Sequence, residues 1–221
     1  MTSGLRYDAY LFDKDGTLVD FAATWDEVVG EALRASTADD AAFIAAADAI
    51  GFDHHARRVL PGSVFIAEPW TVVAEVTAGL VDVSVFGAEL QRLGADHAVP
   101  MRGLAATVEA LAAQPAGLAV VTNDGADLAQ RQLESLSVDH LFDIVLGFDS
   151  VARPKPAPDM LVAAADHLGV DPRRCLVIGD SAHDLAAARR ASMDSALIGS
   201  ADVGAELPTH RIDNLADLLA L

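Results

Sequence analysis

The sequence is poor in cysteine and in positive charge. A single cysteine, Cys175, excludes a disulfide framework and a metal site built from several cysteines. The 15 basic residues stand against 33 acidic ones, which gives a net charge of −18. A chain this negative repels phosphate backbones and anionic lipid headgroups. We therefore expect no nucleic-acid partner and no membrane partner.

Long hydrophobic runs are also absent. The longest stretch without a charged residue, 110–123, is shorter than the roughly 20 apolar residues that a membrane-spanning helix requires. The first residues contain no long apolar segment of the kind found in secretion signals, so we expect a cytoplasmic protein. With 221 residues, of which 52% are hydrophobic, the chain has room for one large domain, or for one domain with a smaller insert.

Short apolar runs that end in Asp, Asn or Gly predict a parallel sheet buried on both faces. These runs cover residues 10–12, 118–121, 144–146, 176–178 and 195–198. Between them, apolar residues recur at helical spacing, as at Leu104, Val108 and Leu111. Alternation of strands and helices from Arg102 onward indicates an α/β fold with a doubly wound parallel sheet. Such sheets bind ligands beyond the carboxyl ends of their strands.

Residues 21–97 differ from the rest and predict a helical insert after the first strand. The segment 24–27, Thr-Trp-Asp-Glu, has the pattern of a capping box and predicts a helix start at Thr24. Alanine-rich segments with helical spacing follow. The predicted domains are a core, residues 1–20 and 98–221, and a helical domain, residues 21–97.

Two carboxylates, Asp13 and Asp15, follow the first predicted strand. Like charges this close together are costly unless a cation or a shared proton offsets them. Gly16, which comes next, lets the backbone approach a ligand closely. A strand end followed by an ordinary Asp-Gly turn explains this segment equally well.

Other predicted strand ends add further polar groups. Thr122 and Asn123 supply a hydroxyl and an amide after one strand, and Asp180 and Asp184 supply two carboxylates after another. Together with the two carboxylates of the first strand end, they predict a pocket of hard oxygen ligands suited to Mg²⁺. The alternative is that Asp180 or Ser181 caps the following helix and that Thr122 merely ends a strand.

The chain has only two lysines, against 13 arginines. Lys155 lies in the segment 153–159, Arg-Pro-Lys-Pro-Ala-Pro-Asp, whose prolines restrict the backbone. An ammonium fixed there would offset the repulsion among the carboxylates and contact a phosphoryl group, whereas the alternative is a solvated loop lysine. Lys14 lies between Asp13 and Asp15. Strand alternation predicts that its side chain points away from both, as a structural or surface residue.

Four segments in order resemble the motifs of the haloacid dehalogenase superfamily: 13–17 (Asp-Lys-Asp-Gly-Thr), 120–123 (Val-Val-Thr-Asn), 155–159 (Lys-Pro-Ala-Pro-Asp) and 179–184 (Gly-Asp-Ser-Ala-His-Asp). With its insert after the first motif, the chain is similar to the phosphoglycolate phosphatase-like and β-phosphoglucomutase-like branch. The resemblance implies a Rossmann-like core with an inserted α-helical cap. Where this family often has Ala-Gly after the fourth motif, the chain has Ser192, which leaves the geometry of that turn open.

The resemblance also implies roles for single residues. Asp13 would be the nucleophile that takes the phosphoryl group as an aspartyl-phosphate, and Asp15 the general acid and then the general base. Thr122, with the backbone amide of Asn123, would hold phosphoryl oxygens, and Lys155 would neutralise the phosphoryl charge. The implied phosphate-binding set is Asp13, Gly16, Thr122, Asn123 and Lys155.

The implied cofactor is Mg²⁺. Its ligands would be Asp13, the main-chain carbonyl of Asp15, and Asp180. Asp184 would be a further ligand or a hydrogen-bond partner of one.

The implied function is that of a Mg²⁺-dependent phosphatase, a phosphoric monoester hydrolase acting on a small phosphorylated metabolite such as phosphoglycolate. Asp15 argues against carbon–halogen chemistry, because haloacid dehalogenases proper lack that carboxylate. The insert contains no lysine, which excludes the Schiff base of phosphonoacetaldehyde hydrolases. A β-phosphoglucomutase-like mutase and a non-catalytic binding protein on the same fold stay open. Candidate specificity residues are Trp25, Arg57 and Arg58, and we expect a monomer or a homodimer.

Overall fold

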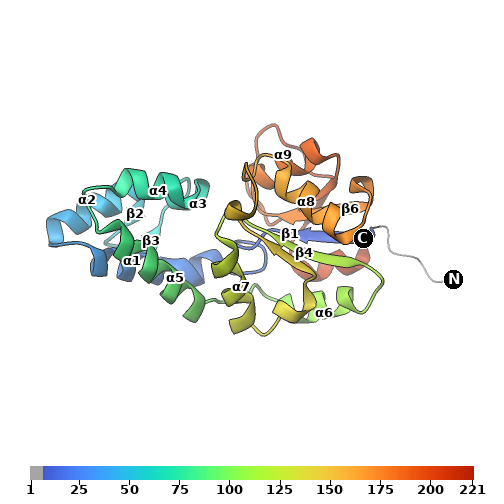
Figure 1. Cartoon of the computed structure of the whole chain (residues 1–221), viewed down its shortest axis with the longest axis horizontal. Helices are drawn as coiled ribbons and strands as arrows, with labels where there is room; N and C mark the ends of the chain where they lie inside the picture. Colours follow the sequence, from blue (N-terminus) through green and yellow to red (C-terminus); the bar gives the residue numbers. More distant parts are fainter. Residues whose placement is uncertain (1–6) are drawn as a thin grey trace. The chain divides into compact units, whose positions relative to one another are not determined.

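The structure, a computed structural model, describes residues 7–221. The chain divides into two compact units (Figure 1). The residues up to Val19 together with Pro100–Leu221 form the core unit, and Asp20–Val99 form the helical unit. The helical unit covers the stretch for which the sequence predicts an insert, and its function as a cap remains a proposal.

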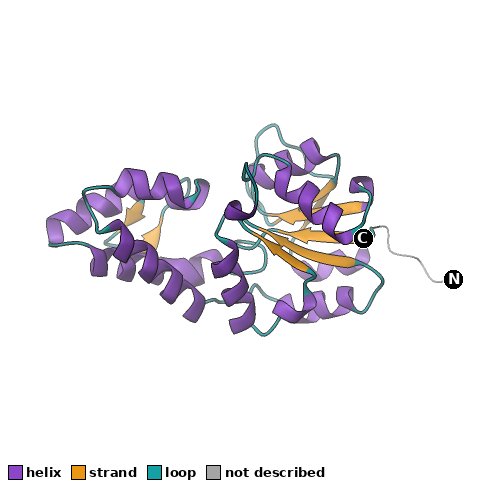
Figure 2. Ribbon diagram, in the orientation of Figure 1, coloured by secondary structure: helices purple, strands orange, loops and turns teal. Residues whose placement is uncertain are grey.

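A six-stranded parallel sheet forms the centre of the core unit (Figure 2). The strands stand in the order β5-β4-β1-β6-β7-β8. They are β1 (Ala9–Phe12), β4 (Gly117–Val121), β5 (Ile144–Leu146), β6 (Cys175–Gly179), β7 (Asp194–Ile198) and β8 (His210–Ile212). Five of them coincide with the apolar runs of the sequence. The edge strand β8 is absent from the prediction, because its residues, His-Arg-Ile, form no apolar run.

Helices cover both faces of this sheet (Figure 2). They are α6 (Leu104–Ala112), α7 (Ala126–Ser135), α8 (Asp159–Leu168) and α9 (Ala182–Ala191). Short 3-10 helices cover Asp139–Leu141, Phe148–Ser150, Pro172–Arg174 and Leu215–Ala220. This is the doubly wound α/β fold that the sequence predicts.

Each face of the sheet has its own hydrophobic cluster. Along β1, Tyr10 and Phe12 pack on the side that holds α6, whereas Ala9 and Leu11 pack on the side that holds α8 and α9. All four of these side chains are fully buried. Alternate side chains of a strand point to opposite faces, so burial on both faces requires a continuous apolar run. This requirement explains why the central strands can be recognised in the sequence as continuous apolar runs.

The helical unit contains α1 (Phe21–Ser36), α2 (Asp40–Ile50), α3 (Val64–Ala67), α4 (Trp70–Thr77) and α5 (Val83–Asp96). A small antiparallel pair, β2 (Phe52–Asp53) and β3 (Arg58–Val59), lies between α2 and α3. No helix in residues 7–221 is long and apolar enough to cross a membrane.

The predicted start of the first helix in this unit is wrong. The N-cap of α1 is Asp20, whose side chain accepts a hydrogen bond from the backbone N–H of Ala23. Thr24 is instead buried inside the helix, and its hydroxyl accepts a hydrogen bond from the N–H of Val99. The capping pattern at Thr24 is therefore a coincidence of composition, since Asp20 fills the same role four residues earlier.

Candidate active site

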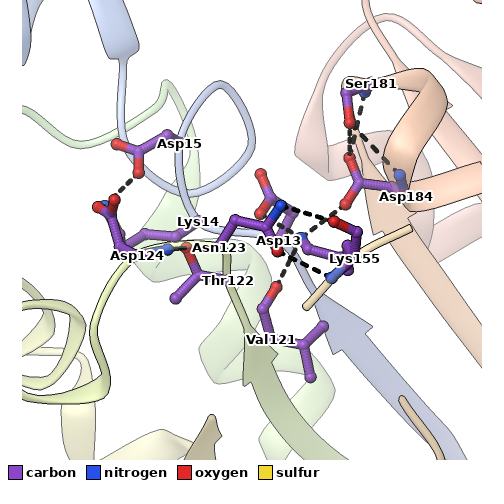
Figure 3. Close-up of polar contacts among 10 residues, drawn as sticks. All are labelled: Asp13, Lys14, Asp15, Val121, Thr122, Asn123, Asp124, Lys155, Ser181 and Asp184. Atoms are coloured by element: carbon purple, nitrogen blue, oxygen red, sulfur yellow. Dashed lines mark hydrogen bonds and ion pairs between the residues drawn. The ribbon is translucent and has the colours of Figure 1, made fainter. Parts of the chain in front are cut away.

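Three strand ends meet at one edge of the sheet. Phe12, at the end of β1, pairs in register with Val120 of β4 on one side and with Ile178 of β6 on the other. The residues that follow these strands therefore lie beside one another (Figure 3). In this way the topology brings together segments more than 100 residues apart in the sequence, at the edge where α/β sheets bind ligands.

Lys155 lies at the centre of this convergence and is 4% exposed. Its Nζ is 2.6 Å from Asp13 Oδ1, 2.7 Å from Asp184 Oδ1 and 2.8 Å from the carbonyl oxygen of Val121 (Figure 3). Burial alone lowers the pKa of Lys155, but the carboxylates of Asp13 and Asp184 raise it above its usual range. Lys155 therefore stays charged and bridges two of the predicted site carboxylates.

Asn123 fixes the backbone of Lys155. Its side-chain nitrogen donates to the carbonyl oxygen of Lys155 over 2.9 Å, and its Oδ1 accepts from the N–H of Lys155 over 3.0 Å. The sequence suggested only the backbone amide of Asn123 as a phosphate ligand, so this contribution of its side chain is new. Thr122, next to it, is buried, and its hydroxyl accepts a hydrogen bond from the N–H of Asp124 over 3.1 Å.

Asp13, Asp180 and Asp184 form a compact group of carboxylates. Each offers one oxygen, and these oxygens lie within 4.8 Å of one another. Burial raises the pKa of Asp13 well above its usual range despite the opposing effect of Lys155, and Asp184 and Asp180 raise it further. Burial, followed by the charge of Asp184, raises the pKa of Asp180 to about 7.

The donors of this group fit Mg²⁺. Hard cations with two charges prefer carboxylate oxygens, and the pKa values of Asp13 and Asp180 are raised first by burial and then also by repulsion from the neighbouring carboxylates. A divalent cation relieves that repulsion. The structure thus places the side chains of Asp13, Asp180 and Asp184 where they could share one ion. The carboxylate of Asp15 lies outside this group.

Both carboxylate oxygens of Asp184 already have protein partners. Oδ1 accepts from Lys155, and Oδ2 accepts from the hydroxyl of Ser181 over 2.5 Å and from the N–H of Ser181 over 3.2 Å. Ser181 is the N-cap of α9 and forms a capping box with Asp184. The capping alternative is therefore correct for Ser181. Because its orientation is fixed, Asp184 is well placed to hold Lys155 near Asp13.

Gly16 allows the loop after β1 to approach Asp180. Its φ of +79° lies in the left-handed region, and a Cβ at this position would come within 2.1 Å of Asp180 Oδ2. Any side chain would displace that carboxylate. The glycine therefore sets the spacing between the first and fourth sequence motifs.

The expectation that the Lys14 side chain points away from Asp15 is wrong, and so is a position at the surface. Lys14 is 0% exposed, and its ammonium is hydrogen-bonded to Asp15 and lies 2.9 Å from Asp124 Oδ2. Strand alternation fails because β1 ends at Phe12 and a turn follows. Burial alone lowers the pKa of Lys14, but Asp124 and Asp15 raise it above its usual range. Asp124 was missed by the sequence reasoning, although an ammonium next to a site requires such a partner.

The three candidate specificity residues belong to the helical unit. Trp25 is 3% exposed, and its ring lies 5.5 Å from that of Phe65. Arg57 is exposed, with Nη2 3.4 Å from Glu27 Oε1, and Arg58 is exposed in β3. Trp25 thus has a packing role, and a contribution of these residues to specificity remains a prediction.

Comparisons with known proteins find similar sequences and a similar fold. A model of the family of haloacid dehalogenase-like hydrolases matches residues 7–192. A phosphoglycolate phosphatase from Colwellia psychrerythraea is 32% identical over 200 residues, which are 85% of this chain and 82% of that protein. A phosphoglycolate phosphatase from Aquifex aeolicus is 31% identical over 117 residues, 52% of this chain and 55% of that protein, so the match spans about half of this relative. The crystal structure of a predicted phosphoglycolate phosphatase from Haemophilus somnus 129pt has a TM-score of 0.71, with 25% identity and 97% coverage of both chains.

Proposed function

Because the chain belongs to the haloacid dehalogenase-like hydrolase family, we propose that it is a Mg²⁺-dependent phosphatase that hydrolyses a small phosphomonoester through an aspartyl-phosphate on Asp13. One observation carries this proposal. The buried ammonium of Lys155 lies 2.6 Å from Asp13 and 2.7 Å from Asp184, beside a third carboxylate, Asp180. This arrangement places one positive charge against Asp13 and leaves three carboxylates that could hold a divalent cation, and both charges would offset the repulsion when Asp13 attacks a phosphate ester.

In the first half of the reaction, a carboxylate oxygen of Asp13 forms a bond to phosphorus while the bond from phosphorus to the alcohol oxygen breaks. Asp15 gives its proton to the leaving oxygen. Lys155 offsets the negative charge of the phosphoryl group, and the hydroxyl group of Thr122 donates a hydrogen bond to a phosphoryl oxygen. Asp13, Asp180 and the adjacent Asp184 would hold Mg²⁺, which supplies further positive charge at the phosphoryl group when bound.

In the second half, water attacks the phosphorus of the aspartyl-phosphate. Asp15, now a carboxylate, takes a proton from the water, and the bond from phosphorus to the Asp13 oxygen breaks. Inorganic phosphate leaves, and Asp15 is protonated for the next turnover. Asn123 supports both halves, because its two hydrogen bonds to the backbone of Lys155 keep the ammonium at the reacting oxygen.

The relatives support a proposal for the substrate class. Two of the similar proteins are phosphoglycolate phosphatases, so we propose a small phosphorylated carboxylic acid or alcohol as the substrate. The helical unit offers Arg57 and Arg58 as candidates for contacts with the anionic part of such a molecule.

The test is phosphate release from a panel of phosphorylated metabolites, with p-nitrophenyl phosphate as a general substrate. We expect release that requires Mg²⁺, and an acid-quenched sample of Asp15→Asn that retains a phosphoryl group on Asp13, detected by peptide mass. Asp13→Asn is the matched control, since it cannot form the adduct. Isomerisation of a sugar phosphate without phosphate release would replace this function with that of a mutase. Absence of any turnover would indicate a binding protein.

A further inference from the structure

Both lysines of the chain lie in the candidate active site, and each ammonium is between two carboxylates. Lys155 pairs with Asp13 and Asp184, and the proposed reaction uses it. Lys14 pairs with Asp15 and Asp124, and nothing in that reaction accounts for it. An ammonium withdrawn from water is costly unless its partners are well placed. The position of Lys14 therefore calls for an explanation.

Lys14 connects two loops of the site. Its carbonyl oxygen accepts hydrogen bonds from the N–H groups of Leu18 over 2.7 Å and Val19 over 2.9 Å, which fixes the turn after β1. At the other end, Asp124 is held after β4, because its N–H donates to Thr122 and its carbonyl oxygen accepts from Phe148 over 2.9 Å. The backbone of Lys14 is therefore fixed by hydrogen bonds, and so is the backbone of Asp124, whose carboxylate contacts the ammonium.

Asp15 lies outside the group of carboxylates that could share a metal ion. Lys155 holds Asp13 and Asp184, and Ser181 also holds Asp184, whereas the side chain of Asp15 is 21% exposed. The contact with Lys14 fixes this side chain to the buried part of the site (Figure 3). A group that transfers a proton must stay within hydrogen-bond reach of the reacting oxygen.

We propose that Lys14 is a positioning residue that holds the carboxyl group of Asp15 beside the leaving oxygen, and that Asp124 holds Lys14 in turn. This inference rests on the proposed function, since it requires Asp15 to transfer the proton. The bonds made and broken are those already given: the proton goes from Asp15 to the alcohol oxygen as the phosphorus–oxygen bond breaks. Lys14 itself exchanges no proton and touches no substrate.

The chemistry of the leaving group separates positioning from a purely structural role. A nitrophenolate leaves without a proton, whereas an alkoxide requires one as the bond to phosphorus breaks. Loss of the correct position of Asp15 therefore slows cleavage of an alkyl phosphate far more than cleavage of an aryl phosphate. General loosening of the site would slow both reactions alike.

The experiment compares kcat/KM for phosphoglycolate and p-nitrophenyl phosphate in the wild type and in Lys14→Met, with saturating Mg²⁺. We expect Lys14→Met to lower kcat/KM for the alkyl ester by a factor at least about tenfold larger than the factor for the aryl ester. This difference lies within the range that a general acid contributes. In an Asp15→Asn background, Lys14→Met should lower kcat/KM by no more than about twofold. Lys14 then has no general acid to position, and the effects of coupled residues are not additive. Arg173→Met is the control, since it removes an exposed positive charge from the same unit.

Equal losses for the two esters, or a full loss that persists in the Asp15→Asn background, would overturn the inference. If Lys14→Met does not fold, Asp124→Asn serves instead. This substitution removes one of the two carboxylates that hold the Lys14 ammonium. It must therefore lower the ratio of kcat/KM for the alkyl ester to kcat/KM for the aryl ester, and an unchanged ratio refutes the role of Lys14. If phosphoglycolate is not a substrate, the alkyl phosphate of the panel that the wild type hydrolyses best replaces it, and a wild type that hydrolyses neither p-nitrophenyl phosphate nor any member of the panel refutes the proposed function. A wild type that hydrolyses both an alkyl and an aryl ester, with a ratio that Lys14→Met leaves unchanged, refutes only the role of Lys14.

Discussion

Replacing Lys155 by methionine keeps the length of the side chain and removes the ammonium that lies between Asp13 and Asp184. Both carboxylates are buried, and Lys155 is 4% exposed, so water cannot replace the lost charge. Breaking a buried ion pair by removing one partner costs about 3–5 kcal/mol. For a chain of this size, such a loss of unfolding free energy corresponds to a fall in Tm of about 6–20 °C.

The assay is thermal unfolding at pH 7 without a divalent cation, followed by kcat for p-nitrophenyl phosphate with Mg²⁺. The matched control is Arg153→Met, two residues away on the same loop. Arg153 is 70% exposed and forms an ion pair with Asp159 over 2.8 Å, and exposed pairs of this kind contribute little. We expect Arg153→Met to leave Tm and kcat almost unchanged. Lys155→Met should also lower kcat by at least about 10²-fold, since the pKa of Asp13 rises further and one charge contact with the phosphoryl group is lost.

Two results would refute this reasoning. If Lys155→Met and Arg153→Met have the same Tm within a degree or two, the ion pairs of Lys155 contribute no more than a surface pair. If Lys155→Met keeps near-wild-type turnover, the ammonium does not act on the phosphoryl group. Added Mg²⁺ should recover part of the lost Tm, because the ion brings positive charge back to the same carboxylates.

Three further outcomes are expected. Asp13→Asn should abolish turnover while Tm without a metal stays at or above that of the wild type, because one of three buried carboxylates loses its charge; near-normal turnover would exclude Asp13 as the nucleophile. The pKa of Asp180, raised from 3.8 to about 7, means that the folded metal-free protein binds a proton that the unfolded chain releases, so its unfolding free energy falls as the pH rises through this window. Mg²⁺ competes with that proton, and the Tm increase on adding it should be larger at about pH 8 than at about pH 5.5; equal increases would contradict the metal site. Ser192→Gly should stabilise the protein by about 0.5–1 kcal/mol without changing turnover, because Ser192 ends α9 at φ 60°. The reverse change, Gly169→Ala at the end of α8 with φ 67°, should destabilise the protein by a similar amount. A Ser192→Gly variant that is less stable than the wild type, or a Gly169→Ala variant that is more stable, would refute this account.

Much of the fold follows from the sequence because the central strands are buried on both faces of the sheet. β1, β4 and β6 lie between two layers of helices, so their residues form apolar runs that stop where the strands stop. β8 escapes detection because its residues, His-Arg-Ile, form no apolar run, whereas β5 at the other edge, Ile-Val-Leu, does form one. The start of α1 was misplaced because Asp20 and Thr24 both suit an N-cap, and only the path of the chain at Val99 decides between them.

The site was predictable where topology alone brings residues together. Asp13, Thr122 and Asp180 follow neighbouring strands, so a parallel sheet must place them at one edge. Contacts made by long side chains within the turns were not predictable. The pairing of Lys14 with Asp124 depends on the chain leaving the strand geometry at Phe12, and no periodicity encodes that point.

The use of lysine and arginine in this chain follows the geometry of its acids. Arginine forms the exposed ion pairs of the core unit, as in the bidentate contact of Arg174 with Asp8, where a planar fork matches one carboxylate. Lys14 and Lys155 each lie between two carboxylates from different segments of the chain, and Lys155 also donates to a backbone carbonyl. A compact ammonium can donate in three directions at once, whereas a guanidinium would force these segments apart. Among residues 7–221, Lys14 and Lys155 are the buried basic side chains, and each contacts acceptors on more than one side, as a compact ammonium allows.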